Sequence, residues 1–265
     1  MTQHRKSVPQ TTKQPESTQA PDPTPDEWRR LLDAALRFQE LAPWNWMAEA
    51  DIFGVMDPET GDTGFVSVMG GIGEHFAMSL YLGEEALHDF LAIEYSELAA
   101  GHEQIMEIPQ LMASFVERDD LENRDRKVLK RLGIMPQRER AWPQFQSYRP
   151  GFWPWFVDGA EARRLAVALE QAADVAPRCK DDETLLYPDS ENQFLVRRQN
   201  ESGQWVDEVK KVPPPPPNPF QLFVPGEYIQ AMKALPGGAS IIEMDLCMFP
   251  FRIGKKDERH SIPML

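Results

Sequence analysis

The sequence predicts an α+β fold in which an antiparallel meander of strands packs against helices. Three successive segments between residues 51 and 82 have the composition and spacing of strands joined by short turns. Apolar residues at helical spacing occupy residues 25–41 and 158–175, on either side of these strands. With 265 residues, of which 42% are hydrophobic, the chain is long enough to bury a substantial core.

Residues 1–25 are polar and contain five prolines. Such a segment buries too little apolar surface to offset the entropy of ordering it, so we expect a disordered tail. The tail ends in Thr24-Pro25-Asp26-Glu27, a capping box with proline at the first helical position. A helix is therefore predicted from Pro25 to about Leu41.

Three strands are predicted next, over residues 51–56, 64–69 and 74–82. The sequence DPETGD supplies a hairpin turn between the first two strands, and the sequence GGIG connects the second strand to the third. In the third strand we expect Phe76, Met78, Leu80 and Leu82 on one face, and His75, Ala77, Ser79 and Tyr81 on the other.

A helix over residues 83–98, a strand over residues 109–116 and a charged helix over residues 119–132 are predicted to follow. Asp158 is the expected N-cap of a further amphipathic helix. Between the last two helices, residues 141–156 hold seven aromatic residues and three prolines without a helical or strand period. We therefore expect an extended, packed loop there.

We place a domain boundary near residue 180, where the composition changes. The module beyond it is predicted to contain an isolated hairpin (194–198 and 204–209), a polyproline II spacer (213–217), a short helix (225–235) and a strand (239–249). The expected organisation is a tail over 1–25, an α+β domain over 26–180 and a smaller module over 181–265. Because this module has a small core, either it packs onto the first domain or the chain is a fragment.

The composition indicates a cytoplasmic protein. The N-terminus has no apolar segment typical of a secretory signal, and no run of 18 apolar residues occurs. The two cysteines, Cys179 and Cys247, lie far apart in the sequence, which fits a reducing compartment. A single disulfide between them is the alternative that the sequence leaves open. A net charge of −14 argues against general nucleic-acid binding, which needs a basic surface.

Charge is distributed unevenly along the chain. Residues 38–117 contain fifteen acidic residues and no lysine or arginine, whereas residues 118–149 contain nine basic and five acidic residues. Two interpretations are open: the basic helix neutralises the acidic sheet within the fold, or the acidic stretch forms a face for a cation or a basic partner.

No metal site and no cofactor are expected. None of the five histidines has a metal-ligand spacing, and only His75 beside Glu74, with His88 beside Asp89, forms a pair worth examining. The acidic turn DPETGD lacks the twelve-residue ligand pattern of an EF-hand. The glycines of GGIG lead from strand to strand, whereas a phosphate-binding loop leads into a helix.

The weak candidates for catalysis lie on one predicted strand face. His75, Ser79 and Tyr81 share that face, and Asp51 or Asp57 supplies a nearby carboxylate. If the face is concave, these groups offer the acid–base chemistry of a hydrolase. The competing expectation is an ordinary polar face of an antiparallel sheet.

The aromatic segment 141–156 is the candidate surface for a ligand or partner. Aromatic residues around an arginine form stacking platforms for planar ligands, but proline-rich aromatic segments also fill cores. The candidate binding residues are Trp142, Tyr148, Arg149, Trp153 and Trp155.

Four stretches, APWNWMAEADIFGVMDPETGDTGFVSVMG, EHFAMSLYLGEEAL, AWPQFQSYRPGFWPWF and EARRLAVALEQA, resemble a bacterial family of uncharacterised proteins that share a domain of unknown function. The resemblance spans about residues 27–180. The stretches FLVRRQNESGQWVDE and IIEMDLCMFPF resemble a second uncharacterised domain often fused to the first. The resemblance implies no catalytic residues. It also implies that the second domain continues beyond residue 265, and that the zinc-binding SEC-C tail of some relatives is absent here.

These observations favour a non-catalytic binding or accessory module with a protein partner of unknown identity. The alternatives are the hydrolase-like enzyme described above and, third, a nucleic-acid adaptor that uses the basic stretch 118–149. No membrane association is expected, and the sequence gives no indication of the oligomeric state.

Overall fold

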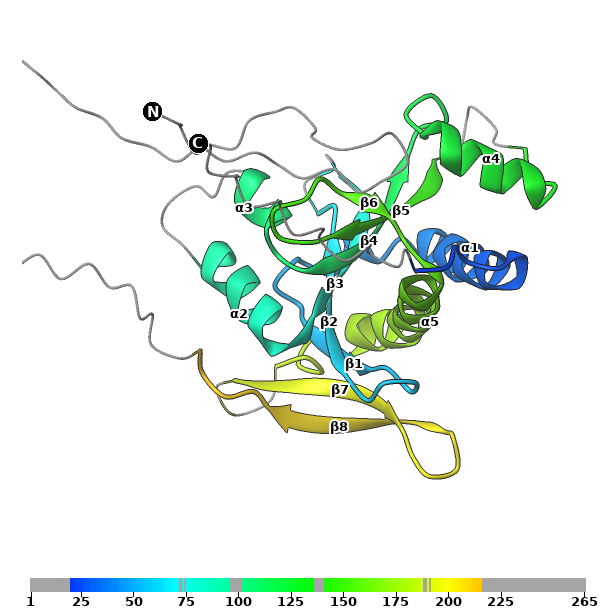
Figure 1. Cartoon of the computed structure of the whole chain (residues 1–265). Coiled ribbons are helices and arrows are strands. Elements are labelled where there is room, and N and C mark those ends of the chain that lie inside the picture. Colours follow the sequence, from blue (N-terminus) through cyan, green and yellow to red (C-terminus); the bar gives the residue numbers. More distant parts are fainter. Residues whose placement is uncertain are drawn as a thin grey trace, which may run out of the picture.

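The computed structural model describes residues 20–71, 73, 75–95, 102–135, 141–187, 190 and 192–215. In this part of the chain, eight strands form one sheet in the order β6-β5-β4-β3-β2-β1-β7-β8 (Figure 1). The strands are β1 (Phe53–Met56), β2 (Thr63–Met69), β3 (Ala77–Leu82), β4 (Gln110–Val116), β5 (Trp142–Tyr148), β6 (Trp155–Phe156), β7 (Gln193–Gln199) and β8 (Trp205–Lys211).

The sheet is a meander with one parallel junction. From β1 to β6, each strand pairs antiparallel with the next one along the chain. The β7–β8 hairpin then returns to the other side of β1, where β1 and β7 run parallel through the pairs Gly54–Val196 and Val55–Arg197. The mixed sheet therefore confirms the α+β class and the antiparallel meander.

Helices cover both faces of the sheet. The long helices α1 (Pro25–Leu41) and α5 (Gly159–Asp181) lie side by side on one face, and α2 (Gly83–Glu94) and the short α3 (His102–Met106) lie on the other (Figure 1). The helix α4 (Asn123–Arg131) lies beyond the end of the sheet near β5 and β6. A short 3-10 turn, η1 (Pro43–Asn45), follows α1.

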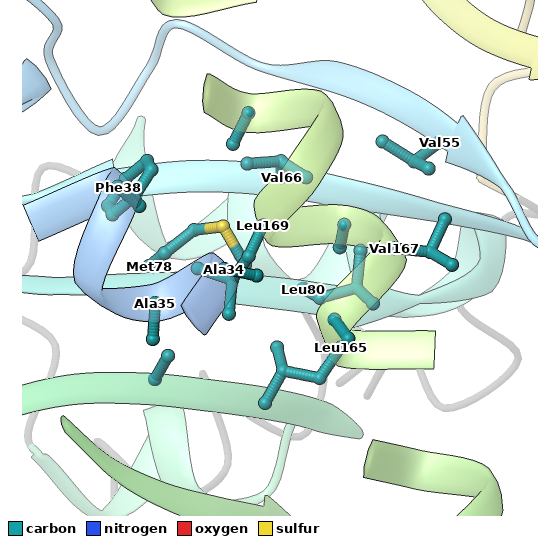
Figure 2. Packing of buried hydrophobic residues seen from close by; sticks show 14 of the residues in the cluster. Ala34, Ala35, Phe38, Val55, Val66, Met78, Leu80, Leu165, Val167 and Leu169 are labelled. Atoms are coloured by element: carbon teal, nitrogen blue, oxygen red, sulfur yellow. The ribbon is translucent and has the colours of Figure 1, made fainter. Parts of the chain in front are cut away.

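The main core lies between the sheet and the pair α1–α5 (Figure 2). Met78 and Leu80 of β3 point toward these helices, where they meet Phe38 of α1 and Leu165 and Leu169 of α5. This packing confirms the predicted orientation of the apolar side of β3. The opposite face is also buried, because Phe65 and Tyr81 pack there against Leu87 and Phe90 of α2. The face of β3 that carries Tyr81 is therefore not a solvent-exposed polar face.

Both long helices begin with a capping box. The backbone N–H of Glu27 donates to Thr24 Oγ1 (3.3 Å), and the N–H of Thr24 donates to Glu27 Oε2 (2.7 Å). At α5, the N–H of Glu161 donates to Asp158 Oδ1 (2.9 Å) and the N–H of Asp158 donates to Glu161 Oε2 (3.0 Å). The predicted starts of both helices are confirmed.

Three expectations need correction. Residues 141–156 are not an extended loop, because they form β5, which pairs with β4, and β6, which pairs with β5. The hairpin expected to stand apart is joined to the meander through β1. The charged helix is shorter than expected and begins at Asn123, because a turn occupies residues 118–121.

The strand over residues 109–116 is confirmed as β4. The expected tail over residues 1–19, and the short helix and strand expected after residue 216, lie outside the described residues.

Candidate functional site

An open groove of about 1050 Å³ lies between α4 and β6. One wall is the segment Asp120–Lys127, the other is formed by Trp155 and Phe156, and Ala20 and Asp22 close one end. The groove lies at an edge of the sheet, since β6 is the last strand on that side.

An arginine and two aromatic rings meet in this groove. The guanidinium carbon of Arg124 lies 4.4 Å from the centroid of the Phe156 ring, a cation–π contact. Trp155 stands edge-on to Phe156, with centroids 5.3 Å apart and an angle of 67° between the ring planes. Arg124 also donates to Asp22 Oδ1, so the guanidinium is fixed above the ring. A planar or apolar group entering the groove therefore meets a preformed aromatic surface.

The helix α4 supplies positive charge. It carries Arg124, Arg126, Lys127, Lys130 and Arg131, and its one carboxylate, Asp125, is buried. Lys127 and Arg131, one turn apart, line a second hollow of about 260 Å³ between α4 and the start of α1. Among the described residues, neither forms an ion pair. The groove itself is mixed in charge, because Asp22, Asp120 and Glu122 also line it.

Within the described residues, no ion pair joins the basic helix α4 to the acidic stretch 38–117. Its ion pair within the described residues joins Arg124 to Asp22, which precedes the acidic stretch. Two other basic residues pair with that stretch instead: Arg163 of α5 with Glu59, and Lys210 of β8 with Glu84.

Asp125 lies behind the groove, between α4 and β5. Gln144 Nε2 donates to its Oδ2 at 3.4 Å. Burial raises the pKa of this carboxyl to about 6, and the amide of Gln144 opposes the shift only in part. The residue therefore titrates close to neutral pH within the contact that holds α4.

The candidate residues of the aromatic segment do not share one surface. Trp142 and Tyr148 are buried, in different apolar clusters on β5. Trp153 and Trp155 are half-buried, and only Trp155 lines the groove. Of the seven rings in this segment, only that of Phe152 is classed as exposed.

Arg149 directly follows β5, and its guanidinium lies at the start of α5. Its Nη2 donates to Glu161 Oε1 (2.7 Å) and lies 3.9 Å from Asp158 Oδ2. Both partners belong to the capping box, so the guanidinium ties the end of β5 to the N-terminus of α5.

The hydrolase candidates are divided between surface and interior. His75 is exposed and precedes β3, whereas Ser79 and Tyr81 are 0% exposed beneath α2. Asp51 accepts hydrogen bonds from the N–H of Ala48 (2.7 Å) and the hydroxyl of Tyr187.

The carboxylate of Asp57 accepts hydrogen bonds within its own turn, from the N–H of Glu59 (2.9 Å) and from the hydroxyl of Thr60 (3.3 Å). The structure thus brings Ser79 and Tyr81 together and leaves His75 outside the interior where they lie.

Other reactive groups are limited in the described residues. No group of three or more histidine, cysteine or acidic side chains there is arranged to bind a metal ion. Burial raises the pKa of the Cys179 thiol to about 11, so it is protonated at neutral pH. None of the helices in this part of the chain combines the length and the apolar character that crossing a membrane requires.

Sequence reasoning missed Phe156, Arg124 and Asp22 as lining residues. Phe156 belongs to the aromatic segment and Arg124 to the basic stretch, so both signals were present separately. Their contact depends on how α4 folds back beside β6, a long-range arrangement that neither local pattern contains.

A family model described as a domain of unknown function (DUF7309) matches residues 28–197, more than half of the 265-residue chain. The match includes α4, β5 and β6 and ends within β7. No curated protein and no solved structure matches the chain. The chain therefore belongs to the DUF7309 family.

Proposed function

We propose that the protein is a non-catalytic binding module that takes up an extended segment of a protein partner in the groove between α4 and β6. The observation that carries the proposal is the fixed stack of Arg124 on Phe156, with Trp155 beside it, in an open groove at the sheet edge. Rings held in place before binding add contact area at little cost in entropy.

The lining indicates the chemistry of the segment. The rings of Trp155 and Phe156 suit a proline or an aromatic side chain, which packs well on flat apolar surfaces. Lys127 and Arg131 project from α4 next to this surface and suit carboxylates. The expected partner segment therefore carries proline or tryptophan within a few residues of aspartate or glutamate.

A peptide-binding measurement tests the proposal. Fluorescence polarisation is measured with a labelled acidic peptide that contains proline and tryptophan. A charge-reversed peptide, in which lysines replace the acidic residues, is measured in parallel. We expect the Lys127→Glu protein to bind the acidic peptide about three- to tenfold more weakly than the wild type, because an attraction becomes a repulsion. Lys211→Glu, the same change on the exposed end of β8 at the opposite sheet edge, should leave the affinity unchanged.

The aromatic contribution is tested by Trp155→Ala, with folding checked by near-ultraviolet circular dichroism. This variant should lose most of the affinity. Equal weakening by Lys127→Glu and Lys211→Glu would show only a general charge effect and would contradict the groove. Tight binding of a single-stranded oligonucleotide that Lys127→Glu abolishes, with no peptide bound, would favour the nucleic-acid adaptor instead.

The hydrolase alternative has less support from the geometry. Its hydroxyl candidates are fully buried and its histidine is exposed. A substrate would have to pass beneath α2 to reach Ser79, while the histidine lies outside.

A further inference from the structure

A run of five prolines, residues 213–217, follows the last strand of the sheet, and we call it the proline tract. The three of these prolines that the structure describes, 213–215, are exposed and belong to no helix or strand. The residue before them is fixed, because Val212 is 1% exposed and its N–H donates to the backbone oxygen of Asn192 at 2.8 Å. Consecutive prolines favour the polyproline II conformation, which loses little entropy when it binds.

The groove between α4 and β6 has the lining that a proline-rich segment requires. The rings of Trp155 and Phe156 stand edge to face there, 5.3 Å apart, and the guanidinium of Arg124 covers Phe156 at 4.4 Å. Polyproline II segments dock in grooves lined by aromatic rings, because the flat faces of proline pack well on them. The groove, at about 1050 Å³, is as large as the pockets of about 300 to 1000 Å³ that enclose drug-sized molecules.

The proline tract cannot reach the groove of its own molecule. The strands β6 and β8 are the two edge strands of the eight-stranded sheet (Figure 1). Seven strand spacings of about 4.8 Å separate them, or about 34 Å in all. The tract begins two residues after β8 ends at Lys211, and five residues of polyproline II span only about 15 Å. The tract that enters a groove therefore comes from another molecule.

Charge also favours a second copy of this chain. The start of the proline tract lies beside α2, because Val212 packs in the apolar cluster beneath that helix. The outer side of α2 carries the exposed carboxylates of Glu85 and Asp89. The groove lies beside α4, whose Lys127 and Arg131 are exposed and form no ion pair among the described residues. A tract from a second copy thus brings an acidic helix close to a basic one, and the two attract each other.

We propose that the groove between α4 and β6 of one molecule binds the proline tract of a second molecule. The inference rests on the groove of the proposed function and identifies its partner as a second copy of this chain. The acidic groups expected in that partner come from α2, which adjoins the tract in space. Because the two surfaces differ, the molecules join head to tail, and each dimer retains one free groove and one free tract.

Sedimentation velocity of the full chain between about 5 and 500 μM measures this association. We expect the average mass of the wild type to rise with concentration. Trp155→Ala removes a ring of the groove and should weaken the association at least about tenfold. Pro213→Ser, Pro214→Ser and Pro215→Ser combined, which we call the tract variant, should weaken it equally. Pro58→Ser, at an exposed proline in the turn between β1 and β2, is the control and should have no effect.

A mixture of the two defective proteins gives the sharpest test. Trp155→Ala retains its proline tract, and the tract variant retains its groove. The equimolar mixture should therefore form a dimer and no larger species, because one groove and one tract are available. The tract variant alters only exposed residues, so its folding is unaffected even if Trp155→Ala proves unstable. Its loss of association, with Pro58→Ser unchanged, supports the proposal by itself.

Four results would overturn the proposal. The first is a wild type that stays monomeric at about 500 μM. The second is a tract variant that associates as strongly as the wild type, and the third is a mixture of folded variants that stays monomeric. The fourth is association that appears only when residues 1–19 are removed, which would mean that this segment, adjoining Ala20 at the end of the groove, occupies it instead.

The peptide measurement separates this proposal from the function on which it rests. A monomeric wild type that binds the acidic peptide would contradict the second copy and leave the groove as a binding site. Association that depends on Trp155 and on the proline tract, without any binding of the acidic peptide, would support the second copy and contradict the acidic peptide as the ligand.

Discussion

Asp125 shows how a single buried carboxyl couples the attachment of α4 to pH. The residue is 7% exposed, and its pKa of about 6 lies well above the value near 4 of an aspartate in an unfolded chain. The folded protein therefore holds this proton more firmly than the unfolded chain does. The stability that the group contributes is complete below about pH 4 and is lost as the pH rises through about 6.

We predict that Asp125→Asn, which imitates the protonated acid, stabilises the protein at pH 8 by about 1 to 3 kcal/mol and has little effect at pH 4. Urea unfolding between pH 4 and 8 measures the difference. Glu201→Gln, an exposed carboxyl in the turn between β7 and β8, is the control and should give a small, flat profile. A pH-independent effect of Asp125→Asn would show that the carboxyl is not held as the structure indicates.

At the scale of elements, the two capping boxes differ in their surroundings. The oxygens of Asp158 and Glu161 also meet Arg149, and Ser147 Oγ donates to Glu161 Oε1 at 2.7 Å. The box of α1 is more exposed, although Arg163 reaches Glu27 at 2.6 Å. The box of α5 thus belongs to a network with β5, while that of α1 has one distant partner, Arg163.

Asp158→Ala should therefore destabilise the protein by about 2 kcal/mol and Thr24→Ala by about 1 kcal/mol, at the upper and middle parts of the range for N-caps. Chemical denaturation of the two variants under identical conditions makes the comparison. Equal losses would mean that Arg149 adds nothing to the cap.

How far the elements could be predicted depended on how local their causes are. The starts of α1 and α5 followed from Thr24 and Asp158, because a cap is decided within four residues. The aromatic strand β5 was missed because buried side chains occur on both of its faces: Phe145 packs in the main core and Tyr148 packs near Met112. A strand buried on both sides does not alternate, so its sequence has no period of two.

The groove was missed for a related reason. Its rings and its basic residues were noticed separately, as the aromatic segment and the basic stretch. Arg124 and Phe156 are distant in sequence and come together only through packing of α4. Nor could the sequence show that Ser79 and Tyr81 are enclosed, because their concealment depends on α2 covering that face.

At the scale of the whole molecule, the β7–β8 hairpin is held to the meander by a narrow junction. Gly54 of β1 faces Val196 of β7 so closely that a Cβ at Gly54 would lie 2.8 Å from Val196 Cγ2. Arg197 extends this junction to α5, with its guanidinium 2.6 Å from Asp207, 2.9 Å from Asp174 and 3.1 Å from Gln171. The Arg197 side chain of β7 thus connects the β1–β7 pair to α5.

Arg197→Ala should loosen the hairpin more than the rest of the sheet. The Arg197 side chain is 10% exposed, and its loss leaves Gln171 and part of Asp207 without partners, at a cost of about 2 kcal/mol. Arg198→Ala is the matched control, since its pair with Glu208 is largely exposed and should contribute less than about 0.5 kcal/mol. Native-state hydrogen exchange resolves the two cases by strand.

In Arg197→Ala, the amides of β7 and β8 should exchange faster while those of β3 and β4, in the middle of the meander, keep most of their protection. The junction with β1 is the hairpin's only strand contact with the meander among the described residues, so opening there need not disturb the other strands. Uniform acceleration across all eight strands would mean that the hairpin and the meander unfold as one cooperative unit, and that the boundary near residue 180 has no energetic counterpart.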